Sequence, residues 1–489
     1  MSLFIFRRDL RVTDNTGLLV CIDRVMSGSS HGPIYLVFIF TKQQIGKENF
    51  YRSSNAIQFM INSLEFLSSR VKVNFYYGTE PVSILDEILE ANEIKTLTVN
   101  RDYTPYSIKR DRSIEKWCKL KGIEFYSLHD AMLSGDHLEI VAKSSGKVYN
   151  MFTHFKNRVI TGDLIRRPRS MQREAFVLFK ELASSPSKVS LDSIRKKFRH
   201  NPHLIVKGTR LEAVEILKGL TAFDNYDSTR DYPFNPTTGL SAHNKFGTIS
   251  PREVYYHIID KLGSDSSLAI QMIWRDFYYY HLYHNIGNLE NSFSDKRWDT
   301  RFKWNLGLED FSIFSRDPSR FTKKEQQIAL YKAWCEGRTG VPIVDAGMRQ
   351  LNKTGYMHNR CRMIVAMFLT KNLMFHWKWG EAYFASQLTD YDPALNNGNW
   401  QWSSGTGVDP LRFGIPRIFN AWSQGEKSDP NAEYIKKWIP ELGEIDPSDI
   451  HNWESSHQKY ETVDYPKPIV SHDDSRRQFL EEFERVFKN

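Results

Sequence analysis

Short strand-like runs alternate with helix-like runs over about the first 125 residues, and this alternation constrains the fold more than any other feature. The strand-like runs, which are rich in β-forming residues and bounded by polar ones, lie at 2–6, 33–40, 71–77 and 96–99. Helical patterns lie between them, for example at 55–70 and 81–92. Strands that alternate with helices of this length predict right-handed βαβ units and a parallel sheet covered on both faces. The turn after the first strand reads RRDLRVTDN, so the GxGxxG fingerprint of a dinucleotide site is absent there.

The strand pattern weakens between about 130 and 205, where basic and serine-rich patches indicate a long interdomain connection. Beyond 210 the strand signal almost disappears, and helical patterns dominate through 440, for example at 251–262, 266–285 and 359–377. The sequence therefore predicts an α/β N-terminal domain with a Rossmann-like parallel sheet and an all-α C-terminal domain. The predicted boundaries are 1–128 for the first domain, 129–205 for the linker and 206–489 for the second domain.

Composition indicates a soluble intracellular protein, cytoplasmic or, in a eukaryote, nuclear. Charged residues make up 25% and hydrophobic residues 40% of the chain, as is ordinary for soluble proteins. No window approaches the roughly 18 apolar residues of a membrane span, and the apolar run at the N-terminus is too short for a signal peptide. The four cysteines are far apart without a CxxC pair, which favours a reducing compartment. The net charge of +8 mildly favours a polyanionic partner.

Polar residues that cost free energy to bury lie among large aromatics between 340 and 402. The apolar run at 363–369 is typical of a buried helix, so the charges that flank it need partners inside the protein. The polar residues concerned are Asn359, Arg362, Asp390, Asp392 and Asn396. Ionic groups and tryptophans that converge on an interior predict a large, planar ligand with polar edges.

Two further segments carry chemical groups at suggestive spacing. Thr237, Thr238, Gly239 and Ser241 precede helical sequence, where small hydroxyl residues and backbone N–H groups can bind phosphate, although this segment taken alone favours a capped loop. Gln271, Trp274 and Tyr278 share a helix face; packing explains the two aromatics but not the glutamine. Tryptophans can relay a one-electron oxidation, but they more often simply pack.

Eight motifs are spread along the chain: RRDLRVTDN (7–15), NRDYTPY (100–106), GLSAHNKFGTISPR (239–252), WRDFY (274–278), GRTGVPIVDAGMRQL (337–351), HNRCRM (358–363), NNGNWQW (396–402) and KKWIPEL (436–442). In these motifs the chain resembles the photolyase/cryptochrome family over nearly its whole length, and most closely the class I cyclobutane pyrimidine dimer photolyases.

The resemblance implies FAD, active as FADH⁻ and folded into a U within the helical domain. The residues placed at its pyrophosphate are Tyr226, Thr237, Thr238, Gly239, Leu240 and Ser241. Arg275 would border the cofactor, and Arg362 and Asp390 would form a buried ion pair near the isoalloxazine, with Asp392 alongside. Asn396 would face flavin N5. The resemblance also implies an antenna pigment on the N-terminal sheet, either methenyltetrahydrofolate or 8-hydroxy-deazaflavin.

Family motifs further imply an electron relay and a DNA surface. Trp400 and Trp377 match the first two members of the relay; Trp304 is the choice for the outer position, ahead of Trp298 and Trp334. Trp274 and Trp402 correspond to the aromatic walls around a flipped dimer. Other positions that match contacts to the dimer or to DNA are Gln271, Asn359, Met363, Arg230, Arg360 and Gln424.

The implied activity is that of a DNA-repairing lyase on UV-damaged DNA: light-driven electron transfer from FADH⁻ splits the dimer. We expect a monomer and find no metal-ligand cluster in the sequence. Gln271 departs from the Glu usual in class I dimer enzymes, which leaves a (6-4) photolyase or a cryptochrome-like photoreceptor as alternatives. The (6-4) enzymes carry histidines where Asn359 and Met363 stand, and His358 would point about 100° away on a helix.

Overall fold

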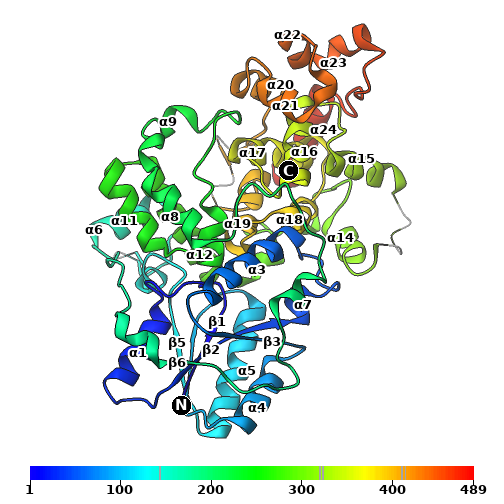
Figure 1. Cartoon of the computed structure of the whole chain (residues 1–489). Helices are drawn as coiled ribbons and strands as arrows, with labels where there is room; N and C mark the ends of the chain where they lie inside the picture. The colour runs from blue at the N-terminus through cyan, green and yellow to red at the C-terminus, as the bar shows by residue number, and fades with distance from the viewer. Residues whose placement is uncertain (143–144, 319–320, 322–323, 409–410, 413–414, 489) are drawn as a thin grey trace.

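A parallel sheet of five main strands, with the short β6 added beside β2, forms the centre of the N-terminal half of the computed structural model (Figure 1). The structure describes the chain except 143–144, 319–320, 322–323, 409–410, 413–414 and 489. The strands are β1 (Ser2–Phe6), β2 (Ile34–Thr41), β3 (Val73–Gly78), β4 (Thr96–Asn100) and β5 (Glu124–Leu128). Their spatial order is β3-β2-β1-β4-β5. The four predicted strands are confirmed. β5 was not predicted; it is a partly exposed edge strand, EFYSL, without a long apolar run.

Helices cover both faces of this sheet, as the βαβ pattern predicts. Their bounds are α1 (Thr16–Met26), α2 (Lys42–Ile45), α3 (Ser54–Ser68), α4 (Pro81–Ala91) and α5 (Pro105–Lys121). Phe4 and Phe6 of β1 pack with α1 and α3, whereas Leu3 and Ile5 pack with α4 and α5. This alternation follows from the two-residue period of a strand.

The segment 129–205 runs between the two halves and contains short elements of its own. These are α6 (Phe152–Thr161), β6 (Phe179–Lys180) and α7 (Leu191–Arg195). α6 packs on α12 of the helical half, whereas β6 pairs with β2 and α7 packs on α3. The segment thus contacts both halves of the molecule.

The second half is helical, as predicted. Its helices are α8 (Arg210–Lys218), α9 (Tyr226–Thr229), α10 (Ser241–Phe246), α11 (Pro251–Leu262), α12 (Ser267–His284), α13 (Arg297–Thr300), α14 (Leu308–Phe314), α15 (Glu325–Glu336), α16 (Pro342–Thr354), α17 (Asn359–Met367), α18 (Trp377–Gln387), α19 (Pro393–Ser404), α20 (Ala421–Ser428), α21 (Glu433–Trp438), α22 (Pro447–His451), α23 (Trp453–Ser456) and α24 (His472–Phe487). A two-residue pair, β7 (Leu411–Arg412) and β8 (Ile415–Pro416), lies between α19 and α20. Among the described residues, no helix is long and apolar enough to cross a membrane.

The prediction of one continuous helix over 359–377 is wrong. α17 ends at Met367, a π-helical turn follows at Phe368–Asn372, and the chain then breaks. Met374 has a φ of 54°, and His376 caps α18 by accepting a hydrogen bond from the Lys378 backbone N–H. Trp377 therefore begins a new helix. The sequence of this segment carries no Gly or Pro to signal the break.

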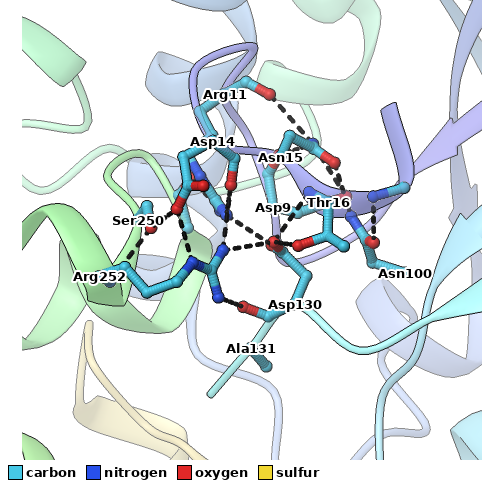
Figure 2. Close-up of polar contacts among 12 residues, drawn as sticks. Asp9, Arg11, Asp14, Asn15, Thr16, Asn100, Asp130, Ala131, Ser250 and Arg252 are labelled. Carbon is cyan, nitrogen blue, oxygen red and sulfur yellow. Dashed lines mark hydrogen bonds and ion pairs between the residues drawn. The ribbon is translucent and has the colours of Figure 1, made fainter. Parts of the chain in front are cut away.

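A buried ionic network joins the two halves (Figure 2). Arg252 of α11 donates to Asp14 Oδ2 (2.6 Å) and to Asp130 Oδ1 (2.8 Å), and Arg11 donates to Asp130 Oδ2 (2.6 Å). Ser250 also donates to Asp14. Each charged side chain in this network is at most 2% exposed. The network therefore brings the RRDLRVTDN and TISPR segments, more than 200 residues apart, into one interior contact.

Candidate functional site

The hydroxyl-rich loop at 237–241 precedes α10 and faces the middle of the helical half. Thr237 Oγ1 and Tyr356 OH are hydrogen-bonded at 2.7 Å, and Thr238 Oγ1 accepts from the Leu240 backbone N–H at 3.4 Å. Gly239 has a φ of +68°, a conformation that favours glycine. Ser241 is exposed, and Tyr226 of α9 is half-buried with a pKa raised by burial. Hydroxyl and N–H donors gathered on one loop suit a phosphate group.

Arg275 of α12 is buried beside this loop. Its Nη1 donates to the Ala131 carbonyl at 2.5 Å and its Nη2 to the Asn244 carbonyl at 3.4 Å. Asn244 Oδ1 is buried and has no hydrogen-bond partner within the described protein. A buried amide oxygen of this kind is costly unless an O–H or N–H donor reaches it, so it supports a ligand at this position.

Arg362 of α17 and Asp390 form a bidentate ion pair, with nitrogen–oxygen distances of 2.9 and 3.2 Å. Arg362 Nε also donates to the Met357 carbonyl at 2.8 Å. Burial acts to lower the pKa of Arg362, but the attraction of Asp390 raises it above its ordinary value. The pair therefore presents a fixed, ionised polar edge between α17 and the start of α19.

Asp392 has partners that the sequence did not reveal. Its carboxylate caps α19 at the Ala394 N–H (3.0 Å), accepts from Tyr279 OH (2.6 Å), and pairs with Arg8 at the end of β1. Burial acts to raise the pKa of Asp392, but Arg8 and then Arg275 lower it below its usual value. Asp392 thus links the polar centre of the helical half to the edge of the sheet.

Asn396 lies one turn into α19, and its Nδ2 donates to the Glu381 carbonyl of α18 at 3.2 Å. Glu381 is 2% exposed, and its Oε2 has no partner among the described residues. Sequence reasoning missed Glu381; a carboxylate inside the run WKWGEAYF was the available signal.

The candidate relay tryptophans gather around α18. A Cβ at Gly380 would lie 2.1 Å from Trp400 Cη2, so this glycine lets the Trp400 ring approach α18 one turn from Trp377. On the other side, the His376 ring lies 5.3 Å from the Trp377 ring and 5.6 Å from the Trp304 ring, centroid to centroid. Trp400 therefore packs on α18 at Gly380, and His376 contacts both Trp377 and Trp304. Sequence reasoning did not single out Gly380 or His376.

Trp334 and Trp298, the alternatives to Trp304, are less suited to the outer position of the relay. Trp334 is fully buried and packs on Trp400, at 6.3 Å between ring centroids, so it lies at the inner end of the series. Trp298 is 2% exposed and packs against Trp304, which is 8% exposed. Trp304 is thus the most accessible of the three.

Several predicted DNA-side residues lie at the surface. Gln271, Asn359 and Arg230 are exposed, and Arg360 pairs with Asp231 at 2.5 Å. Met363 and Gln424 are half-buried, and Asn359 Nδ2 contacts Met363 Sδ at 3.8 Å. All of these but Arg230 and Gln424 lie on α12 or α17.

Both predicted wall tryptophans are half-buried and held by a neighbour. Trp274 stacks on Phe152 of α6, with centroids 3.6 Å apart and planes 9° apart. The Arg417 guanidinium lies 4.8 Å from the centre of the Trp402 ring. One face of Trp274 is therefore fixed by the protein.

His358 does not reach this surface. It is 2% exposed and caps α17 through Nδ1, which accepts from the Arg360 N–H at 3.2 Å. Burial lowers its pKa to about 4, so the ring is neutral at physiological pH. A histidine proton donor, as expected of a (6-4) enzyme, is therefore not supplied by His358.

A cavity of about 420 Å³ lies at the carboxyl ends of β1, β2 and β4. Phe6, Phe38 and Ile57 give it apolar walls, and Arg7 and Arg110 line its polar side. The Nη2 atoms of both arginines are buried without a partner in the described structure. Parallel α/β sheets bind ligands at this edge, and two free guanidinium nitrogens suit a ligand with carbonyl or anionic oxygens.

Comparison with known proteins agrees with this geometry. The sequence profile described as DNA photolyase matches residues 2–169, and that described as the FAD binding domain of DNA photolyase matches 268–485. The deoxyribodipyrimidine photo-lyase of Halobacterium salinarum is 32% identical over 99% of both chains. That of Escherichia coli is 31% identical over 99% of this chain and 98% of its own.

Solved structures are similar over the same length. An archaeal photolyase from Sulfolobus tokodaii, solved with two FAD molecules, is 36% identical with a TM-score of 0.80, covering 99% of this chain and 100% of its own. A cryptochrome from Synechocystis sp. PCC6803 is 25% identical with a TM-score of 0.81, covering 98% of each. The chain therefore belongs to the DNA photolyase family.

Proposed function

We propose that the protein is a deoxyribodipyrimidine photo-lyase, which uses light to split cyclobutane pyrimidine dimers in UV-damaged DNA. The observation that carries the proposal is the arrangement of α12 and α17. Their exposed faces present Gln271 and Asn359, whereas Arg275 is buried on α12 and Arg362 is half-buried on α17. A pyrimidine dimer flipped out of DNA on the surface side would thus lie close to a cofactor on the inner side.

The residues of the helical half fit FAD. The loop at 237–241 and Tyr226 would hold the pyrophosphate, the unpartnered Asn244 Oδ1 would accept from a cofactor hydroxyl or amine, and Arg275 would border it. The Arg362–Asp390 pair and Asp392 would contact the edge of the isoalloxazine, and Asn396 would face N5. When bound and reduced, the flavin supplies the electron that splits the dimer.

The protein's own residues position the damaged DNA. Trp274, backed by Phe152, and Trp402 would stack on the two sides of the dimer, which keeps flat apolar faces after losing its normal pairing. Gln271, Asn359 and Met363 would contact its edges. Arg230, Arg360 and Gln424 would contact the DNA strand; the arginines would add affinity that falls with salt and little sequence preference.

The tryptophans around α18 provide a route by which the flavin is returned to its reduced state. An electron would pass inward from Trp304 to Trp377 and then to Trp400, which would lie nearest the cofactor. The contacts through Gly380 and His376 support this sequence of rings.

The cavity at the sheet edge would hold an antenna pigment of the flavin or deazaflavin type. A flat three-ring pigment matches its apolar walls, and the free Arg7 and Arg110 nitrogens would bind ring oxygens. The Sulfolobus tokodaii photolyase was solved with two FAD molecules, which imply a novel light-harvesting cofactor in that protein. This similarity favours a flavin over a folate here.

The test is an assay of the purified, photoreduced protein under blue light on oligothymidine that contains either cyclobutane dimers or (6-4) products. Repair of the dimer substrate alone is expected; repair of only the (6-4) substrate, or of neither, contradicts the proposal. Chromatography of the pigments released by heat identifies the antenna, and a folate there would contradict the flavin-type assignment.

A further inference from the structure

A buried carboxylate lies one hydroxyl group away from the indole of Trp377. Trp377 Nε1 donates to Ser292 Oγ at 3.2 Å, and Ser292 Oγ donates to Asp299 Oδ1 at 2.6 Å. The Ser292 backbone N–H donates to Asp299 Oδ2 at 2.8 Å. The Asp299 side chain is 7% exposed. The indole N–H of Trp377 is thus connected to a carboxylate shielded from water.

His376 completes this group without adding charge to it. Its Nδ1 accepts from the Lys378 backbone N–H, so the ring proton is on Nε2, which donates to Asp299 Oδ1 at 2.9 Å. Burial lowers the pKa of His376, which keeps the ring neutral at physiological pH. Burial also acts to raise the pKa of Asp299, but the hydrogen bonds from His376 and Ser292 hold it below its usual value. The charge of this trio is therefore the single negative charge of Asp299.

A cation acts on the same indole from another side. Lys378 Nζ lies 5.3 Å from the centre of the Trp377 ring, donates to the Leu289 carbonyl, and lies 3.5 Å from Glu290 Oε2. Glu290 is 77% exposed, so water screens its charge. A positive charge this close opposes removal of an electron from the ring. Asp299, which is hydrogen-bonded through Ser292 to this indole, is a shielded negative charge that offsets it. Glu381, 2% exposed, also interacts with Lys378, but burial raises its pKa.

We infer that Asp299 is a positioning residue for the electron relay, the fixed counter-charge that stabilises Trp377 after it has lost an electron. The inference rests on the proposed function, since Trp400 would lose the first electron to the photoexcited flavin that the helical half would hold. Trp377 then gives one electron to Trp400 and becomes a radical cation. Its proton stays on Nε1, hydrogen-bonded to Ser292, while Asp299 stays ionised. Trp377 regains an electron from Trp304, so that no proton moves in this step.

The test is transient absorption of the flavin-loaded, oxidised protein after a light flash, with wild type compared with Asp299→Asn. Loss of a unit charge at this short range should slow formation of the Trp377 radical cation by about tenfold. Asp299→Glu, which keeps the charge, should restore most of the rate. Asp295→Asn is the matched control, because it removes a carboxylate from the same segment. That carboxylate is paired with Arg297, whose side chain is 40% exposed. Its kinetics should equal those of wild type.

Two results would overturn the inference. The first is that Asp299→Asn shows the same kinetics as wild type. The second is that wild type forms the deprotonated indolyl radical of Trp377 and that its formation slows in deuterated solvent, which would make Asp299 a base. If Asp299→Asn does not fold with flavin, Ser292→Ala serves instead; it keeps the carboxylate, and a slowing of about threefold is expected for the lost hydrogen bond. Unchanged kinetics there would count equally against the inference. Trp377→Phe distinguishes failure of the inference about Asp299 from failure of the proposed relay. Photoreduction at the wild-type rate in that variant would refute the relay itself.

Discussion

At the scale of single residues, Gln271 marks where this chain departs from the class I dimer photolyases that it resembles. The side chain is exposed on α12, one turn before Trp274. An amide can accept and donate hydrogen bonds at a pyrimidine edge, but it carries no charge to balance a radical. Under the proposed function, recognition of the dimer would therefore depend more heavily on Trp274 and Trp402.

Trp402→Ala should weaken binding of dimer-containing DNA by about tenfold or more, since stacking of a base on an aromatic ring contributes about 1–3 kcal/mol. Flavin content should not change, because Trp402 is half-buried and is not among the residues proposed to hold the cofactor. Fluorescence anisotropy with dimer-containing and undamaged oligothymidine measures the effect, and affinity for the undamaged strand serves as the control. Loss of the yellow chromophore would show that Trp402 is misplaced.

Trp377→Phe should slow light-driven reduction of the flavin while leaving repair by chemically reduced enzyme at the wild-type rate. Phenylalanine keeps the packing around His376 but is far harder to oxidise than an indole. Flavin absorbance under steady illumination gives the reduction rate, and a dithionite-reduced sample gives the repair rate. Unchanged reduction kinetics would break the proposed relay.

At the scale of elements, the contact between α18 and α19 depends on the absence of a side chain at Gly380. Its missing Cβ leaves room for the Trp400 ring, as the missing Cβ of Gly398 does for Tyr278 of α12. Small residues at these crossings let large rings fill the space between helices at interior packing density.

Gly380→Ala should destabilise the protein by about 1–3 kcal/mol through overpacking. Gly287→Ala is the matched control, because a Cβ there meets nothing within 4 Å. Urea denaturation of the two variants measures the difference. Equal stability would mean that Trp400 does not pack against α18 as described.

The elements themselves were largely predictable, because alternating apolar runs report burial directly. Strands β1 to β4 and the long helices α11 and α12 follow their sequence patterns closely. β5 escaped prediction because its side chains are only partly buried and EFYSL carries no long apolar run. The break before α18 escaped prediction because it depends on the backbone of Met374, where no breaker residue stands.

Site residues were predictable as types, but their partners were not. The family resemblance implied an ion pair between Arg362 and Asp390, and the structure contains it, with the Arg362 side chain 26% exposed. Arg8 with Asp392, and Asp299 with His376, join residues 77 or more positions apart on unrelated elements. Such pairs depend on how the elements pack, which single-sequence patterns do not encode.

At the scale of the whole molecule, the network of Asp14, Asp130, Arg11 and Arg252 ties the sheet to the helical half. Burial acts to raise the pKa of Asp130, but Arg11 and Arg252 hold it well below its ordinary value. Buried pairs of this kind add little net stability, yet removal of one partner leaves an uncompensated charge.

Asp130→Asn should therefore cost about 3–5 kcal/mol and weaken the junction between the two halves. Asp23→Asn, which breaks an ion pair with Arg169 that is 55% exposed on both sides, should cost about 1 kcal/mol or less. Thermal unfolding measures both shifts. A small shift for Asp130→Asn would mean that the network does not hold the halves together.

Acid should act through the same network. An aspartate in the unfolded chain has a pKa of about 3.9, whereas the pKa values of Asp14 and Asp130 in the folded protein lie lower. As the pH falls, the unfolded chain therefore binds protons before the folded protein does. The stabilisation is fully present above about pH 4 and is lost as the pH falls through the lower, folded values. Melting temperature between about pH 2 and pH 5 tests this, with a shallower slope expected for Asp130→Asn. Equal slopes would assign acid lability to other groups.

The rigid junction between the halves has an optical consequence. Asp14, Asp130 and Arg252 join the two halves in one buried contact, so a pigment in the cavity at the sheet edge and a flavin in the helical half would keep a defined separation and mutual angle. Resonance energy transfer depends on the separation of the two pigments and on the orientation of their transition dipoles. The efficiency with which excitation energy passes from the sheet edge to the flavin would then be set by this junction.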